Sequence, residues 1–126
     1  MENPTYSILI LADGTVRYRE LCAELERDPH YLIQQGDLQA AEPLSGRRSW
    51  DLILIMANSP HLLLKNRASH LAAQWGAPVI FLSGEPRPAS DLPLQPLVQY
   101  VYDDGTAQVQ AVALKLGIRI RIAVTR

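Results

Sequence analysis

Five short apolar runs alternate with helix-like or loop-like segments along the chain, and this alternation limits the possible fold more than any other feature. The runs are rich in β-branched and large aliphatic residues and lie at 6–11, 31–34, 51–56, 79–83 and 98–102. Strands that alternate with helices at short spacing form βαβ units with right-handed crossovers. The sequence therefore predicts an α/β protein built on a parallel sheet.

Amphipathic helices are expected between and after these runs. The first follows a break at 13–15 and ends near Arg27, with a buried face that repeats at i, i+3, i+4 and i+7: Tyr18, Leu21, Cys22 and Leu25. The second begins at Ser59-Pro60 and ends at Gly76, and the last is capped by Thr106 and ends at Gly117. The buried face of the last helix is expected to hold Val109, Val112, Ala113 and Leu116.

The number and spacing of these elements favour one particular arrangement. Five units within 126 residues predict a flavodoxin-like (βα)5 doubly wound sandwich with strand order 2-1-3-4-5. The stretch 84–96 holds four prolines, so the fourth helix is expected to be shortened or replaced by a proline-rich loop. Sites in this fold form at the carboxyl ends of the strands, which fall here at Ala12-Asp13, Met56-Ala57, Ser83-Gly84 and Asp103-Asp104.

Composition excludes several classes of function. With 12 basic and 13 acidic residues, no global field favours direct binding to nucleic acid or to a membrane. A single cysteine, Cys22, fits a reducing compartment and a cytoplasmic protein. His30, His61 and His70 have no acidic or cysteine partner at ligand spacing, and no glycine-rich phosphate loop follows the first run. We therefore expect no metal, no cofactor and no enzymatic activity.

The order of elements, with "ILILAD", "DLILIM" followed by a proline, and "PVIFLSG", resembles the receiver domain of response regulators over essentially the whole chain. The stretch "RELCAELERDPHY" is similar to the first helix of many bacterial, especially cyanobacterial, receivers. In that family, two acids after the first strand and an aspartate ending the third hold Mg²⁺, and this aspartate takes the phosphoryl group. A Ser or Thr after the fourth strand and a Lys after the fifth bind the phosphoryl oxygens.

Most of that phosphorylation site is lost in this sequence. By position, the acid pair falls on Ala12 and Asp13, the phosphoacceptor on Met56, the hydroxyl on Ser83 and the lysine near Asp103. A thioether has no anionic oxygen to attack a phosphohistidine, and an acid at the lysine position repels a phosphoryl group. The resemblance thus implies a degenerate pseudo-receiver, in which Met56 packs as core. "DLILIMANSP" is also similar to the matching stretch of a cyanobacterial clock-protein pseudo-receiver.

Two functional hypotheses follow from the resemblance. The first is a non-phosphorylatable signalling module of a two-component or clock-type system, which acts through a sensor kinase, an effector domain or a second copy of itself. The second is a sensor for a small apolar or redox ligand held in the remodelled pocket; phosphorylation of Asp13 or Asp103 is a third, weaker alternative. The expected interaction face consists of Leu92, Leu94, Leu97, Tyr100, Val109, Arg119 and Arg121.

The last segment, "GIRIRIAVTR", leaves two conformations open. Residues 1–117 are interpreted as the domain and 118–126 as a tail or linker toward a partner chain or an effector domain. As a strand, the segment places its alternate apolar residues on one face and pairs with a sheet edge. As a helix, it continues past Gly117 and aligns Leu114, Ile118 and Ile122. In both cases the apolar face predicts self-association, most simply as a homodimer.

Overall fold

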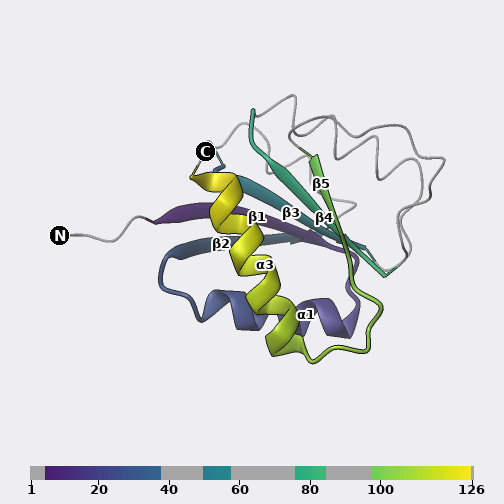
Figure 1. The fold of residues 1–126 in the computed structure, drawn as a ribbon. Helices are drawn as coiled ribbons and strands as arrows, with labels where there is room; N and C mark the ends of the chain where they lie inside the picture. The colour runs from purple at the N-terminus through teal and green to yellow at the C-terminus, as the bar shows by residue number, and fades with distance from the viewer. Residues whose placement is uncertain (1–4, 38–49, 58–75, 85–97, 126) are drawn as a thin grey trace.

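The computed structural model describes residues 5–37, 50–57, 76–84 and 98–125, in which five parallel strands form one sheet of order β2-β1-β3-β4-β5. Two helices, α1 and α3, cover the same face of this sheet (Figure 1). The elements are β1 (Tyr6–Ala12), α1 (Val16–Glu26), β2 (Tyr31–Asp37), β3 (Leu52–Ala57), β4 (Val79–Ser83), β5 (Val98–Tyr102) and α3 (Val109–Val124). The predicted flavodoxin-like fold and strand order are confirmed.

Some predictions fall outside the described residues. They are the helix expected after Ser59-Pro60, the replacement of the fourth helix within 84–96, and the three leucines of the expected interaction face. Gly76, predicted as the left-handed end of that helix, is described and has a φ of +63°. A positive φ of this size is the conformation that glycine adopts without steric cost.

The three central strands are continuous apolar runs because both of their faces are covered. All residues of β3 and β4 are buried, and so are Ile8, Leu9, Ile10 and Leu11 of β1. Parallel sheets that are covered on both faces select such runs in place of alternating patterns. Side chains still alternate between the faces, so that Ile8 and Ile10 face the helices while Leu9 and Leu11 face the opposite side.

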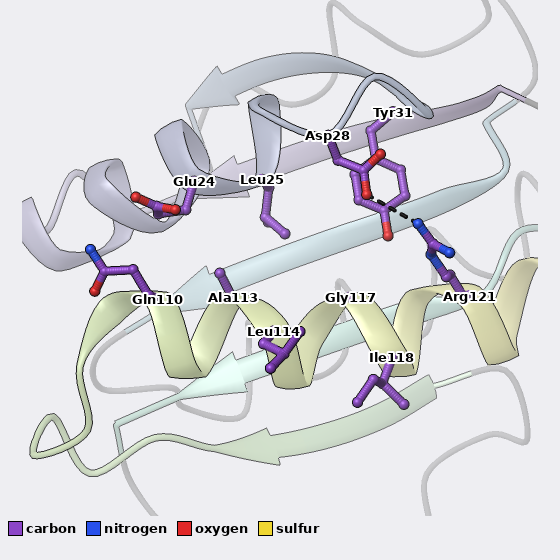
Figure 2. Close-up of a pocket in the computed structure, with 10 residues that line it drawn as sticks. All are labelled: Glu24, Leu25, Asp28, Tyr31, Gln110, Ala113, Leu114, Gly117, Ile118 and Arg121. Atoms are coloured by element: carbon purple, nitrogen blue, oxygen red, sulfur yellow. Dashed lines mark hydrogen bonds and ion pairs between the residues drawn. The ribbon is translucent and has the colours of Figure 1, made fainter.

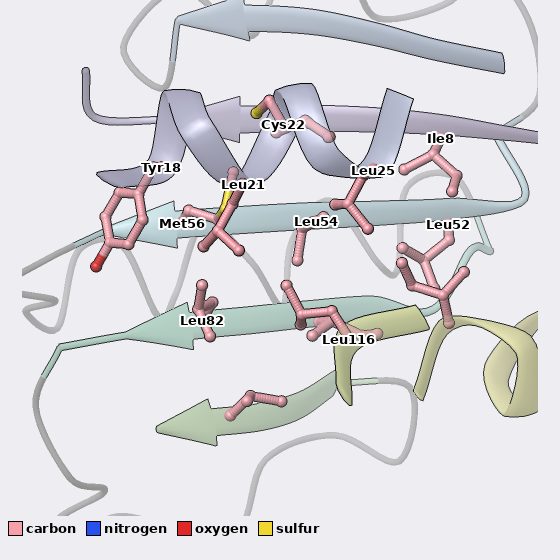
Figure 3. Packing of buried hydrophobic residues seen from close by; sticks show 14 of the residues in the cluster. Ile8, Tyr18, Leu21, Cys22, Leu25, Leu52, Leu54, Met56, Leu82 and Leu116 are labelled. Atoms are coloured by element: carbon pink, nitrogen blue, oxygen red, sulfur yellow. The ribbon is translucent and has the colours of Figure 1, made fainter. Parts of the chain in front are cut away.

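The core on the helix side joins both helices to the sheet (Figure 3). We call it the helix-side cluster; α1 contributes Tyr18, Leu21, Cys22 and Leu25, and α3 contributes Val112, Leu116, Ile120 and Ala123. A second cluster on the other face, the opposite cluster, includes Leu9, Leu11, Trp50, Ile53, Ile55, Ala57, Ala77, Val79 and Phe81. The buried face predicted for α1 is confirmed in full.

The tripeptide Asp-Gly-Thr occurs twice, at 13–15 and 104–106, and forms the same turn in both places. The aspartate Oδ1 accepts hydrogen bonds from the threonine amide and hydroxyl, at 3.0 and 2.6 Å in the first turn and 2.9 and 2.6 Å in the second. The glycines have φ values of +89° and +86°. Because the Thr106 hydroxyl donates to Asp104, the prediction that it caps α3 is wrong, and the N-cap residue is Gln108.

The predicted end of the last helix at Gly117 is also wrong. Helix α3 continues to Val124, so of the two conformations left open for this segment the structure has the helix. Glycine in a helix interior costs about 1 kcal/mol relative to alanine, whereas burying one isoleucine side chain contributes about 1.5–3 kcal/mol. Ile120 is fully buried beyond Gly117, and its burial offsets the cost of the glycine.

Candidate functional site

The carboxyl edge of the sheet brings together the five residues predicted for the degenerate phosphorylation pocket. Ala12 is the register partner of Met56, and the Asp13 amide donates to the Met56 carbonyl at 3.1 Å. On the other side of β3, the Asp103 amide donates to the Ser83 carbonyl at 2.8 Å. Parallel strands present all their carboxyl ends at one edge, and the loops after β1 and β5 are thereby tied to the ends of β3 and β4.

Met56, at the phosphoacceptor position, packs as core. Its exposed fraction is 0%, and its side chain belongs to the helix-side cluster together with Tyr18 and Leu21 of α1 (Figure 3). The prediction that this thioether is a core residue is confirmed. A buried thioether supplies neither a nucleophilic oxygen nor a hard ligand for Mg²⁺.

Asp103 lies near the position at which receivers carry a lysine. It forms an ion pair with Arg17, which the sequence analysis did not identify as a site residue. Arg17 Nε donates to Asp103 Oδ2 at 2.7 Å, and Arg17 Nη2 donates to Asp103 Oδ1 at 2.9 Å. The same Nη2 donates to the Ala107 carbonyl at 2.7 Å, and the Gly105 amide donates to Asp103 Oδ1 at 3.2 Å. The Asp103 side chain is 4% exposed and that of Arg17 23%. This bidentate geometry is the strong form of an arginine–carboxylate contact.

The pair fixes the charge of both groups. The hydrogen bonds from Arg17 lower the pKa of Asp103 below its ordinary value, against the opposing effect of burial, and the Gly105 amide adds to the lowering. The hydrogen bond to Asp103 raises the pKa of Arg17. Burial raises the pKa of the adjacent Tyr18 to about 12, with a further contribution from the charge of Asp13. At neutral pH the edge therefore holds a neutral tyrosine and a mutually neutralised ion pair.

Two cavities of different size border the loop after β5 among the described residues. A cavity of about 60 Å³ lies against the loops after β1 and β5 and is lined by Thr15, Arg17, Tyr18, Gly84, Asp103, Asp104 and Gly105. Small-molecule sites usually measure about 300–1,000 Å³, so this cavity has room only for a few water molecules. A second cavity, of about 320 Å³, also borders Asp103 and Asp104 and is further lined by Val101, Tyr102, Ala107, Ala111, Val112 and Lys115. Its volume lies within the small-molecule range, and the alternative of a ligand sensor stays a prediction.

Neither a metal centre nor a membrane-spanning helix occurs in the described part of the chain. Within 5–37, 50–57, 76–84 and 98–125, no three His, Cys, Asp or Glu side chains are grouped so as to hold a metal ion. No helix in these same ranges is long and apolar enough to cross a membrane.

A larger hollow lies between α1 and α3, away from the carboxyl edge (Figure 2). This α1–α3 groove has a volume of about 480 Å³ and is lined by Glu24, Leu25, Asp28, Tyr31, Gln110, Ala113, Leu114, Gly117, Ile118 and Arg121. At one end Arg121 Nη2 donates to Asp28 Oδ2 at 3.2 Å. Sequence reasoning missed the groove, although Gly117 is a signal for it, since a glycine inside an apolar helix pattern leaves a side-chain-sized gap in the helix surface.

The expected interaction face does not lie on a single surface in the part of it that is described. The Tyr100 ring stacks on Phe81, with centroids 5.7 Å apart, and packs against the opposite cluster. Val109 packs against the helix-side cluster, on the other face of the sheet. Arg119 is exposed on α3, and Arg121 lines the groove.

Comparisons with known proteins give structural neighbours only. No family model matches the chain, and no curated protein sequence matches it. The chain is similar to the response regulator domain of CheB from Thermotoga maritima, at 16% identity and a TM-score of 0.72, over 97% of this chain and 98% of that one. The fold is that of a receiver domain.

A second neighbour has the same receiver fold. It is the N-terminal domain of a response regulator/sensory box/GGDEF 3-domain protein from Carboxydothermus hydrogenoformans, at 21% identity and a TM-score of 0.62, over 92% of this chain and 94% of that one. Both likenesses extend over nearly the full length of each chain. The carboxyl edge described above is therefore the edge at which a receiver carries its phosphorylation site.

Proposed function

We propose that this chain is a receiver-fold signalling module that does not accept a phosphoryl group and acts through protein contacts. The observation that carries the proposal is the Arg17–Asp103 ion pair, which stands beside a buried Met56 at the edge where a receiver is phosphorylated. Phosphoryl transfer to a receiver needs a carboxylate nucleophile and a cation that faces the phosphoryl oxygens. Here the nucleophile position holds a thioether, and the cation is bound to an acid.

The structural neighbours support the class of signalling system that we propose. They are the response regulator domain of CheB and the N-terminal domain of a response regulator/sensory box/GGDEF 3-domain protein. For this chain, the proposal is a role in a cytoplasmic two-component or clock-type pathway, with a sensor kinase, an effector domain or a second copy as the partner. Recognition of a partner protein through the helix surfaces requires no chemistry at Met56. The proposed role is therefore compatible with the thioether at that position.

Acetyl phosphate tests the proposal directly. Incubation with acetyl phosphate and Mg²⁺ should leave the intact mass of the chain unchanged, while a receiver that keeps its acceptor aspartate gains one phosphoryl group under the same conditions. Millimolar Mg²⁺ alone should not raise the melting temperature, whereas a ligand at 100 times its Kd stabilises by about 2.7 kcal/mol. A phosphoryl adduct mapped to any aspartate, Asp13 and Asp103 included, would contradict the proposal.

A further inference from the structure

The outer side of α3 carries a row of large apolar side chains. Leu114, Ile118 and Ile122, here called the apolar row, are 71%, 57% and 50% exposed, and they are half of the six large hydrophobic side chains exposed among the described residues. Their i, i+4, i+8 spacing places them along one face of the helix, over a length of about 12 Å. Single exposed apolar residues are ordinary on soluble proteins, whereas a contiguous row of them marks a contact surface.

Two cations lie beside the apolar row. Lys115 and Arg119 directly follow Leu114 and Ile118 in the chain, so each stands about 100° further round the helix. Lys115 borders the cavity beside β5 and not the α1–α3 groove, which places the two cations on the side of the row away from that groove. Both are exposed, α3 contains no acid, and neither cation forms an ion pair with another described residue.

The charged residues that line the groove, on the other side of the row, are already paired. Arg121 Nη2 lies 3.2 Å from Asp28 Oδ2, and Glu24 Oε1 lies 3.6 Å from Arg27 Nη1. The groove therefore presents little net charge to a partner. The uncompensated charge next to the apolar row is positive and comes from the two exposed cations of α3.

The groove also makes the surface concave next to the row. Leu114 and Ile118 lie along one side of this hollow of about 480 Å³, and Leu25 of α1 lies along the other (Figure 2). Gly117 leaves room in it, because a Cβ added there meets only the Tyr31 hydroxyl, at 3.7 Å. A side chain on the ridge of another helix fits such a groove, whereas a flat lipid surface does not enter it. The shape therefore favours a helix of a protein over a membrane.

We propose that the apolar row and its two cations bind an acidic amphipathic helix of a partner protein. The apolar stripe of that helix packs on the row and places one side chain over Gly117 in the groove. Acids on one flank of the stripe, four residues apart, face Lys115 and Arg119.

Charge complementarity identifies the chemistry of this partner. The apolar row alone fits any amphipathic helix, but the two unpaired cations favour acids and repel a basic helix. The inference rests on the proposed function and deepens it, since it names the class of partner and the face that recognises it.

Two synthetic peptides test the docking. The acidic peptide is a fluorescent, stapled helix of about 14 residues with leucine at i, i+4 and i+8 and glutamates beside the leucines, and the basic peptide has lysines in place of the glutamates. In anisotropy titrations with the full chain, the acidic peptide should bind with a Kd below about 1 mM. The basic peptide should bind at least about fivefold more weakly, and added salt should weaken the acidic one.

Variants at exposed positions of α3 connect the binding to this face. Lys115→Glu combined with Arg119→Glu should reverse the preference, so that the basic peptide binds better than the acidic one. Ile118→Ser should weaken the acidic peptide at least about fivefold. Arg19→Glu and Val16→Ser are the matched controls, because both residues are exposed on α1 outside the groove lining, and they should change the Kd less than about twofold. Circular dichroism establishes that each variant is folded.

Four results would overturn the inference: no binding of the acidic peptide, equal binding of both peptides, a preference that the charge reversal leaves unchanged, or a loss caused equally by the controls. The comparison of the two peptides needs no variant, so it decides even if a variant does not fold.

Other occupants of the face are tested in parallel. Binding to phosphatidylserine vesicles, or dimerisation, that requires the two cations while the acidic peptide does not bind would assign the face to a membrane or to a second copy and refute the inference. None of these measurements involves phosphorylation. A phosphoryl adduct would refute the proposed function alone, and a failure of peptide binding would refute the docking alone.

Discussion

Removing the cation from the Arg17–Asp103 pair should destabilise the protein strongly. Arg17→Met keeps the aliphatic stem but leaves the Asp103 carboxylate, 4% exposed, without its cation. Breaking a buried pair in this way costs about 3–5 kcal/mol, and we expect about 3 kcal/mol because Arg17 is itself 23% exposed. Urea denaturation at pH 7 measures the change. Arg19→Met, an exposed cation on the same helix, is the matched control and should stay within about 0.5 kcal/mol of the parent.

A double-mutant cycle and a pH series separate this pair from general packing. Asp103→Asn alone leaves a partly exposed guanidinium that water can solvate, and should cost about 1–2 kcal/mol. The double variant should cost less than the sum of the two by about 1–2 kcal/mol, because the unpaired carboxylate is gone.

The dependence on pH has a definite sign. In the parent, the folded pKa of Asp103 is lowered, so the stabilisation is fully present above the unfolded value of about 3.9 and is lost as the pH falls through the lower folded pKa. In Arg17→Met, burial without the cation raises the pKa of Asp103. As the pH falls, Asp103 is therefore protonated at a higher pH in the variant than in the parent, and this removes the cost of the unpaired buried charge. The difference in free energy of unfolding between the parent and Arg17→Met should therefore become smaller from pH 7 toward pH 3. A gap that does not depend on pH, or additive single effects, would refute the reasoning.

Substitutions at three further positions test the packing, each by urea denaturation. Gly117→Ala should stabilise by about 0.5–1 kcal/mol, since the new methyl group meets only the Tyr31 hydroxyl at an ordinary 3.7 Å; a loss would mean that the helix needs the glycine. Gly105→Ala should instead destabilise by about 1 kcal/mol or more, because φ is +86°. Met56→Asp should cost about 3 kcal/mol at this fully buried position, whereas Met56→Leu should cost less than about 1.5 kcal/mol; equal stabilities would contradict the core assignment.

The strands could be predicted from the sequence because burial on both faces of a sheet leaves a simple apolar record. Strand β2 shows where that record ends. The apolar pattern predicts its end at Gln34, but the strand pairs with β1 as far as Asp37. Backbone pairing continues through Gln35 and Gly36 because it does not depend on the side chains. The apolar pattern of the sequence therefore cannot predict this part of the strand.

The sequence predicts too short a helix α3 because two local signals agree on the wrong answer. Gly117 is a common helix stop, and the alternation Ile-Arg-Ile-Arg-Ile after it has the period of a strand. In the helix, Ile120 is buried while Ile118 and Ile122 are exposed, so the alternation does not reflect one buried face. Tertiary packing decides the conformation.

The carboxyl-edge site could be predicted in part. The rule that sites form at the carboxyl ends of parallel strands is enough to place Ala12, Met56 and Asp103 at one edge from the sequence alone. The partner of Asp103 could not be found in this way, since Arg17 is 86 residues distant and has the appearance of an ordinary solvent-facing helix residue. Only the geometry of the loop after β5 turns the carboxylate toward it.

Two ion pairs join the first helix region to the last part of the described chain, one to the loop after β5 and one to α3, and this separation in sequence sets the order in which the chain can mature. Arg17 and Asp103 are 86 residues apart, and Asp28 and Arg121 are 93 apart. During synthesis, the apolar face of α1 is made early, and the residues of α3 that close the helix-side cluster are made last among the described elements. At a synthesis rate of about 5–20 residues per second, the apolar face of α1 stays exposed for several seconds before α3 is made. During that time, exposed apolar surface of this kind can bind chaperones or aggregate. The helix-side cluster is completed only when α3 packs against it.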